Sequence, residues 1–228
     1  MTVWNDFMDL IFPNACMVCE HKVSSKNHFI CLHCKQQLPY TNHFHIQENE
    51  LSRKLDPLFD FERAAALLYF ETGSAPQKLI HQFKYHQKKK LAFEMGHLMG
   101  LQLNNTSWVE EIDYLVPVPL HPDKLIKRGF NQSYQLALGI SHCTGIPILK
   151  DVLHRRKNKK SQTKKSKQER LLSVAQNFEW ETSKLTNLNS IALIDDVVTT
   201  GATASACINS LPQSNRADVY FISLAMDV

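Results

Sequence analysis

Two glycine-rich signatures that mark common nucleotide-binding enzymes are absent from this sequence of 228 residues. It contains neither G-x-x-x-x-G-K-[ST] nor G-x-G-x-x-G, which argues against a P-loop nucleotide triphosphatase and against a Rossmann dehydrogenase. A membrane-spanning run is also missing, because the longest uncharged stretch, residues 197–215, is rich in Thr, Ser, Ala and Asn. The first six residues include Asp6 but no Lys or Arg, whereas a secretory signal begins with a basic segment. We therefore expect a cytoplasmic protein without a membrane span.

Positive charge is concentrated in one short segment. The whole chain carries a net charge of +4, from 26 basic and 22 acidic residues. Residues 155–170, called the basic stretch below, hold nine of those basic residues and only one acid, Glu169, so the rest of the chain has 17 basic and 21 acidic residues. The basic residues of the stretch are Arg155, Arg156, Lys157, Lys159, Lys160, Lys164, Lys165, Lys167 and Arg170.

Composition divides the chain into three parts, at residues 1–40, 41–60 and 61–228. The first part holds four of the six cysteines, and its apolar residues before Pro13 recur at helical spacing, which predicts a short amphipathic helix. The second part is polar and poorly patterned, which predicts a linker or an irregular crossing.

The third part alternates strand-like and helix-like segments. We expect strands at 64–70, 114–120, 146–149, 191–194 and 218–225. We expect helices at 76–85, 91–103, 132–143 and 202–211. Strands that alternate with helices are typical of an α/β fold, with a parallel sheet and helices on both faces.

Two C-x-x-C pairs lie near the N-terminus, Cys16 with Cys19 and Cys31 with Cys34, separated by eleven residues. Four thiolates from two such pairs can complete a tetrahedral shell around one Zn²⁺ ion. A closed shell leaves no position for water, so we expect a structural zinc module that is stabilised by its metal.

Other interpretations of the cysteines were weighed. Two disulfides conflict with a cytoplasmic location, and a redox dithiol needs only one C-x-x-C pair. One of three nearby histidines, His21, His28 or His33, could replace a cysteine ligand, although surface positions suit them better. Cys143 and Cys207 lie in predicted helices, where a small core residue is the simpler interpretation.

The most informative segment is residues 191–203, which begins with an apolar strand and continues through Asp195 and Asp196. A short loop of hydroxyl residues with Gly201 then leads into a helix. Backbone N–H groups at such a helix start bind anions, and a glycine lets the backbone approach a ligand closely. A ligand with a phosphate at this helix start and with ribose hydroxyls at the two carboxylates would be a ribose 5-phosphate. An ordinary strand–turn–helix with solvated carboxylates is the alternative.

The complete pattern resembles the phosphoribosyl pyrophosphate (PRPP) motif of type I phosphoribosyltransferases. The resemblance implies that Asp195 and Asp196 contact ribose and that five loop and helix residues hold the 5-phosphate. Those five are Thr199, Thr200, Gly201, Ala202 and Thr203. Mg²⁺ would accompany the pyrophosphate, because a hard divalent cation neutralises its oxygens.

Nearly the whole chain is similar to one branch of that superfamily, the ComF (ComFC-like) competence proteins, which act in natural transformation. The landmarks that match in order are the four cysteines after residues 10–13, Val116–His121 followed by Arg128–Gln132, Gln162 with Glu169, Arg170, Asn177 and Phe178, and residues 191–203. The resemblance therefore implies a type I phosphoribosyltransferase-like α/β domain that follows an N-terminal zinc-knuckle module.

The same resemblance gives the loop after residue 117 a role in holding pyrophosphate. Its two prolines lack N–H donors, so Val118 and Leu120 are the donors that we expect to bind. A rigid turn is the alternative. Lys84 and Arg128 are candidate phosphate contacts or, equally, solvated charges.

Three interpretations of the basic stretch remain open. In this superfamily a flexible loop closes over PRPP at this place, but a catalytic lid needs one or two cations. Contact with nucleic acid would use many more cations and would give a salt-sensitive affinity. The third interpretation is a solvated charged loop. We favour DNA contact. The stretch has no aromatic residue for base stacking, so Phe130, Tyr134 or Trp180 would have to supply it.

These observations support three hypotheses about function. In the first, a competence protein binds PRPP or a related ribose 5-phosphate and handles incoming single-stranded DNA in the cytoplasm. In the second, an active phosphoribosyltransferase uses PRPP and Mg²⁺ on an unidentified base or nucleic-acid acceptor, with turnover dependent on Asp195 and Asp196. In the third, the zinc module docks a competence helicase or a strand-loading protein.

Overall fold

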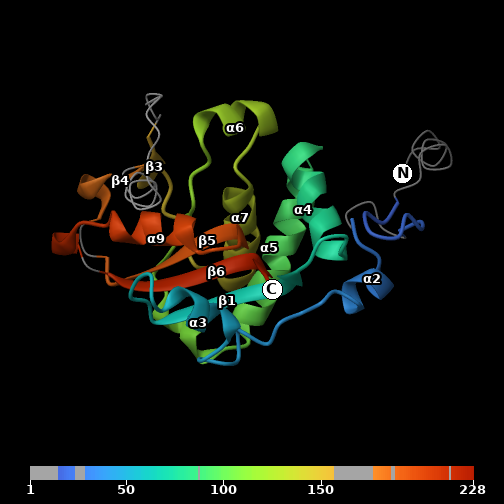
Figure 1. Cartoon of the computed structure of the whole chain (residues 1–228), viewed down its shortest axis with the longest axis horizontal. Coiled ribbons are helices and arrows are strands. Elements are labelled where there is room, and N and C mark those ends of the chain that lie inside the picture. Colours follow the sequence, from blue (N-terminus) through green and yellow to red (C-terminus); the bar gives the residue numbers. More distant parts are fainter. Residues whose placement is uncertain (1–14, 24–28, 87, 157–176, 186–187, 216) are drawn as a thin grey trace.

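The computed structural model describes residues 15–23, 29–86, 88–156, 177–185, 188–215 and 217–228. Its centre is a four-stranded parallel sheet in the order β1-β6-β5-β2 (Figure 1). The strands are β1 (Arg63–Phe70), β2 (Tyr114–Pro117), β5 (Ser190–Val198) and β6 (Asp218–Asp227). The predicted α/β class with a parallel sheet is confirmed.

Both edges of the sheet are extended by short pairings. Tyr40 bridges Leu68 of β1 in antiparallel fashion, and Ile148 bridges Leu115 of β2 in parallel. The strand predicted at 146–149 is therefore reduced to this isolated bridge. The strand predicted at 114–120 ends at Pro117, whereas β5 extends four residues beyond its predicted end, to Val198.

One face of the sheet is covered by α4 (Ala75–Tyr85), α5 (Lys89–Asn104) and α7 (Gln132–Thr144). Helices α5 and α7 touch almost backbone to backbone, because a Cβ atom on Gly96 would lie 2.1 Å from the carbonyl oxygen of Leu136. Helix α7 ends at Gly145, which has a left-handed φ of 78°. The helices predicted at 76–85, 91–103 and 132–143 are thus confirmed to within two residues at each end.

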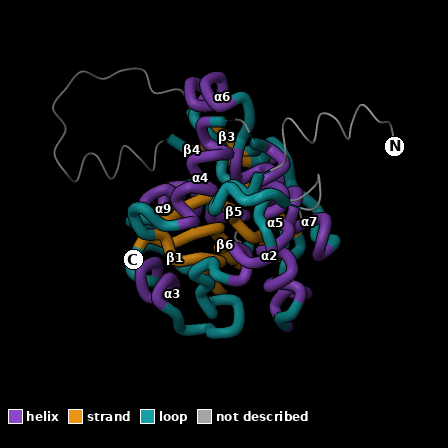
Figure 2. The backbone as a smooth tube through the Cα atoms, turned by 90° about the vertical axis from the view of Figure 1, so that its right-hand side faces the viewer, coloured by secondary structure: helices purple, strands orange, loops and turns teal. Residues whose placement is uncertain are grey.

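The opposite face is covered by α3 (Glu50–Leu55) and α9 (Ala202–Asn209). Figure 2 shows the strands between α3 and α9 on one side and α5 and α7 on the other. Alternate residues of β1 follow this division: Ala64 and Ala66 face the α3 side, and Ala65 and Leu67 face the α5 side. Helices on both faces were predicted and are present.

Helix α3 was not expected, because residues 41–60 were interpreted as a linker or irregular crossing. A capping box formed by Asn49 and Ser52 starts the helix, and Leu51 and Leu55 are fully buried against the sheet. The helix has only six residues, which is too short for its apolar period to be read from sequence. This segment is part of the core.

The remaining elements are short. They are α2 (Leu32–Gln36), α6 (Pro122–Arg128), the antiparallel pair β3 (Leu153–Arg155) and β4 (Phe178–Trp180), and the 3₁₀ turns η1 (Ser107–Glu111), η2 (Thr182–Lys184) and η3 (Gln213–Asn215). The amphipathic helix predicted before Pro13 lies outside the described residues. Within the described residues, every helix is too short or too polar to cross a bilayer.

Candidate functional site

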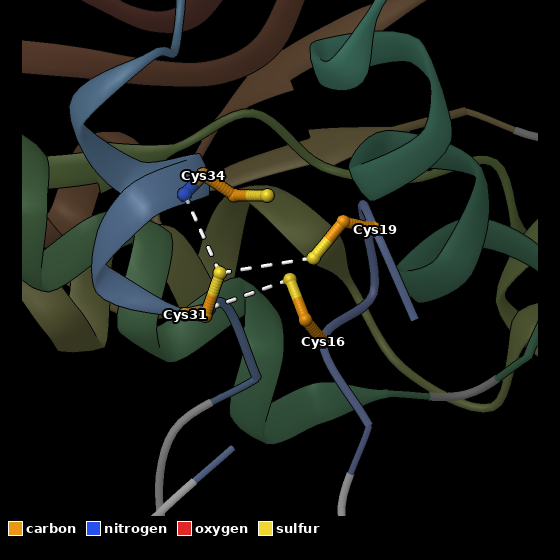
Figure 3. A group of neighbouring side chains, drawn as sticks. All are labelled: Cys16, Cys19, Cys31 and Cys34. Atoms are coloured by element: carbon orange, nitrogen blue, oxygen red, sulfur yellow. Dashed lines mark hydrogen bonds between the residues drawn. The ribbon is translucent and has the colours of Figure 1, made fainter. Parts of the chain in front are cut away.

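The four N-terminal cysteines converge, as their spacing predicted. The Sγ atoms of Cys16, Cys19, Cys31 and Cys34 all lie within 4.8 Å of one another, and those of Cys19 and Cys31 are 3.8 Å apart (Figure 3). Zn–S bonds of about 2.3 Å in a tetrahedron place sulfur atoms roughly 3.8 Å apart. The donor set therefore fits one zinc ion in a closed, structural site.

Local backbone geometry holds this four-cysteine cluster in place. Glu20 has a left-handed φ of 64°, and its N–H donates to the Cys16 carbonyl in the tight turn after the first pair. Cys31 caps helix α2, where its Sγ accepts from the Cys34 N–H at 3.4 Å. Such N–H···S bonds stabilise thiolate charge.

The thiols differ in acidity. Burial acts to raise the pKa of Cys16, but backbone hydrogen bonds from Cys19, Cys31 and Val18 outweigh it and lower that pKa to about 6. Burial raises the pKa of Cys34, and its thiol neighbours add to the effect. A metal must displace the proton of Cys34, so zinc binding releases protons and weakens as the pH falls.

The zinc module shares its core with the α/β domain. The Phe29 N–H donates to Glu94 Oε2 of α5 at 2.9 Å. Cys16, Ile30 and Leu38 belong to the same buried cluster as the α4, α5 and α7 side chains. The described part of the zinc module therefore contributes to the packing on one face of the sheet.

A second group of functional atoms lies at the carboxyl end of β5. This carboxyl-edge site consists of Asp195, Asp196 and residues 199–203. Asp195 and residues 199–203 line part of a small hollow of about 40 Å³, whereas Asp196 follows Asp195 in β5 and is not part of that lining. Thr199 and Thr200 are exposed, and Gly201 has a left-handed φ of 75°. The α9 N-cap, Gly201, makes no side-chain hydrogen bond. Thr200 Oγ1 accepts from the Ala202 N–H at 3.4 Å, which leaves the backbone N–H groups of Thr203 and Ala204 without a capping side chain. Such groups can receive an anion.

The two carboxylates of the carboxyl-edge site have different surroundings. Asp195 is buried and accepts hydrogen bonds at Oδ1 from Ser133 Oγ at 3.2 Å and from the Asp196 N–H at 2.8 Å. Burial, followed by the charge of Asp196, raises the pKa of Asp195 to about 7. Asp196 forms an ion pair with Lys84 of α4, with Nζ and Oδ2 at 2.7 Å. The Ser133 and Lys84 partners were not predicted, because they lie far away in sequence.

The loop after β2 fits its expected role only in part. The Val118 N–H donates to the Ile194 carbonyl at 2.9 Å, which continues the pairing of β2 with β5. Val118 is therefore not an available phosphate donor, and the prediction is corrected; Leu120 stays a prediction. Arg128 donates to Gln132 Oε1 at 2.9 Å, and its guanidinium lies 5.8 Å from the Tyr85 ring centroid.

A hollow of about 470 Å³ lies beside this loop and was not predicted. Its apolar wall comes from the loop and α6, and its polar wall includes Tyr134, Lys150 and Arg155. We call it the Tyr134 hollow. Lys150 Nζ lies 4.7 Å from the Tyr134 ring centroid. Phe130 and Trp180, the other aromatic residues considered for base stacking, are buried.

A hollow of about 790 Å³ lies at the opposite end of the sheet. Asp60, Glu62 and Asp218 contribute to its lining, and carboxylates repel a phosphate. Its size therefore does not make it a candidate for the ligand that the sequence predicts.

Two members of the basic stretch are described. Arg155 lies over the Phe178 ring, at 5.2 Å from its centroid, and Arg156 forms an exposed ion pair with Glu179 at 2.9 Å. Both arginines therefore contact residues of β4, at the end of the β3–β4 pair where Arg155 lies opposite Phe178. The other cations of the stretch, and the landmarks Gln162, Glu169 and Arg170, lie outside the described residues.

Comparison with known proteins gives relatives for most of the chain. It is 25% identical over 205 residues to competence protein F of Haemophilus influenzae, covering 84% of this chain and 88% of that one. It is 24% identical over 225 residues to DNA utilization protein YhgH of Escherichia coli, covering 92% and 96%. Competence protein ComFC of Bacillus subtilis is 37% identical over 103 residues, which cover 45% of this chain and 40% of that one.

Two further matches concern the parts of the fold. Residues 7–44 match the family described as double zinc ribbon domain, which supports a structural zinc at the four-cysteine cluster. Among solved structures, adenine phosphoribosyltransferase from Leishmania tarentolae covers 70% of this chain and 90% of its own, with a TM-score of 0.38 and 12% identity. That score is below the level at which a shared fold follows from it. Over most of its length the chain is thus similar to proteins named for competence and DNA utilization, and its N-terminal part matches a zinc ribbon family.

Proposed function

We propose that this protein binds PRPP or a related ribose 5-phosphate at the carboxyl-edge site and handles single-stranded DNA during natural transformation. The observation that carries the proposal is the arrangement at the end of β5. The carboxylate of Asp195, a hydroxyl loop and a helix start line one hollow, and the carboxylate of Asp196 is adjacent in β5, at the edge where parallel α/β sheets bind ligands.

The phosphate half of the proposal follows from the loop and helix α9. Exposed Thr199 and Thr200 offer hydroxyl groups, and the helix start offers N–H groups and the positive end of its dipole. Gly201 has the left-handed φ of the turn that joins these hydroxyl residues to the helix start, a conformation that glycine adopts without strain. Asp196, 15% exposed at its side chain, is the better placed carboxylate for a ribose hydroxyl.

The DNA half rests on charge and on the relatives. The basic stretch begins at Arg155, the last residue of β3, and Arg155 lines the Tyr134 hollow. An aromatic ring with nearby cations can stack a base and hold its phosphate. Relatives named competence protein and DNA utilization protein support a role with DNA.

Active phosphoribosyl transfer is the second candidate function. The Tyr134 hollow favours it, because its volume of about 470 Å³ can hold a base beside the loop after β2. In this reaction an acceptor atom bonds to C1 of the ribose as pyrophosphate leaves. Release of pyrophosphate from PRPP with a nucleobase or an oligonucleotide, abolished by Asp195→Ala with Asp196→Ala, would establish it.

A transformation assay tests the proposal in cells. A strain carrying Asp195→Asn with Asp196→Asn, at unchanged protein level, is expected to lose transformation by tenfold or more. Transformation at the wild-type level would remove the carboxyl-edge site from the process. Loss of transformation without pyrophosphate release from any acceptor would favour ligand binding over catalysis.

Reversal of charge tests the DNA half separately. Lys159, Lys160, Lys164 and Lys165 are changed together to Glu, and binding to a labelled oligo-dT strand is measured against salt. Each lost phosphate contact reduces the slope of log affinity against log salt by about 0.7. Unchanged affinity and slope would remove the basic stretch from DNA binding.

A further inference from the structure

Lys84 is the feature of the carboxyl-edge site that its sequence motif does not contain. It lies in the last turn of α4, more than 100 residues before the motif, and its Nζ is 2.7 Å from Asp196 Oδ2. Both side chains are mostly covered, with 19% of Lys84 and 15% of Asp196 exposed. Lys78 of the same helix is exposed, so helix α4 aims one particular lysine at this edge.

One oxygen of each carboxylate at this edge already has a partner. Asp195 Oδ1 accepts from Ser133 and from the Asp196 backbone, and Asp196 Oδ2 accepts from Lys84. Mg²⁺ requires near-octahedral oxygen ligands at about 2.1 Å, and a protein holds it through one or two carboxylates together with waters and substrate phosphates. An ammonium at Asp196 occupies that position and repels a second cation, so these residues do not fit a resident Mg²⁺.

We propose that the Lys84 ammonium takes the place of a divalent cation at this edge, so that a phosphoribosyl ligand binds without Mg²⁺. An ammonium has three donors; one holds Asp196, and the others face oxygens of the bound phosphoribosyl group. The inference takes its phosphoribosyl ligand from the proposed function. What it adds is the identity of the cation at the site, which is Lys84 and not Mg²⁺.

Calorimetric titration with ribose 5-phosphate and with PRPP tests this inference. Wild type is expected to bind with affinities that differ by less than threefold between EDTA and excess Mg²⁺. Lys84→Met is expected to bind about 10- to 100-fold more weakly in EDTA, as is typical when a charged hydrogen bond is lost, and to regain part of that loss with Mg²⁺. Lys78→Met is the matched control and is expected to behave as wild type does. Lys84→Arg, which keeps the charge, is expected to bind more tightly in EDTA than Lys84→Met does. A tenfold requirement for Mg²⁺ in wild type, or equal binding by Lys84→Met, would overturn the inference.

A titration with Mn²⁺ alone separates this inference from the proposed function. Without any sugar phosphate, zinc-loaded wild type is expected to show no Mn²⁺ site below millimolar concentration. Lys84→Met is expected to gain one, which disappears when Asp196→Asn is added. Equal Mn²⁺ binding by wild type and Lys84→Met would contradict the role of Lys84, whereas absence of sugar phosphate binding with this Mn²⁺ pattern would contradict only the proposed ligand. Thermal unfolding shows whether each variant is folded.

Discussion

The four-cysteine cluster and the carboxyl-edge site both take their functional atoms from short segments of sequence, but their surroundings are built differently. The cluster uses four identical ligands within 19 residues, and its supporting N–H···S bonds come from the same segment. At the carboxyl-edge site the motif supplies Asp195 and Asp196, whereas α7 and α4 supply their partners Ser133 and Lys84. A local spacing therefore determines the first site, and tertiary packing determines the charge of the second.

The largest expected effect comes from breaking the local site. Cys31→Ser removes a thiolate that both binds metal and caps α2. We expect zinc content to fall from one ion per chain to less than about a fifth, and stability to fall by on the order of 4 kcal/mol, as losses of structural metal do. Metal analysis and urea unfolding measure the two. Cys143→Ser, outside the cluster, is the control; full zinc content in Cys31→Ser would refute the assigned ligand.

Variants of the carboxyl-edge site are expected to lose less stability than Cys31→Ser does. Lys84→Met or Asp196→Asn leaves a largely covered partner alone, at an expected cost of about 2 kcal/mol for each single variant. The double variant is expected to cost less than the sum, because it removes both charges. Urea unfolding of the four proteins gives the coupling energy. Additive costs would mean that the ion pair makes no net contribution to stability.

The raised pKa of Asp195 gives a prediction about pH. The folded state keeps this carboxyl protonated up to about pH 7, whereas the unfolded chain releases its proton near pH 4. The folded state therefore binds more protons between these values, and stability is expected to fall as the pH rises from 4 to 7, by at most about 1.4 kcal/mol per pH unit. The measurement is the unfolding free energy of wild type minus that of Asp195→Asn, with zinc in excess. A difference that does not change with pH would show that Asp195 is ionised in the fold.

A smaller difference in stability is expected between alanine variants of two glycines that have similar backbone angles. Gly201 and Gly145 have φ values of 75° and 78°, but only at Gly201 would a Cβ atom clash, at 2.6 Å from Leu55 Cδ2. We expect Gly145→Ala to cost about 1 kcal/mol through backbone strain alone and Gly201→Ala roughly 1 kcal/mol more. Thermal unfolding measures both. Equal losses of stability in the two variants would mean that α3 can shift away from Gly201 without a loss of free energy.

Sequence reasoning succeeded where a pattern is local and repeated. The class of fold, the helices α4, α5 and α7, and the strands β1, β5 and β6 follow from apolar periodicity, and the four-cysteine cluster follows from spacing. Helix α3 was missed because six residues are too few to show a period, although Asn49 and Ser52 form its cap.

The missed features of the site depend on contacts between distant segments. The sequence indicated Lys84 as a candidate phosphate contact or a solvated charge, but nothing in it pairs this lysine with Asp196. Ser133 has no recognisable role in the sequence, because its contact with Asp195 exists only once α7 packs against β5. Val118 was assigned as a phosphate donor because prolines flank it, but the pairing of β2 with β5 uses its N–H. The Tyr134 hollow joins residues from several segments, so only the fold could bring it together.

Calorimetric titration of PRPP into the zinc-loaded protein tests the central claim most directly, with Asp195→Asn combined with Asp196→Asn as the comparison. We expect saturable one-to-one binding to wild type and at least tenfold weaker binding to the double variant, at equal zinc content and with both proteins folded. No binding to wild type, or equal binding to both proteins, would contradict the claim that the carboxyl-edge site receives a phosphoribosyl ligand.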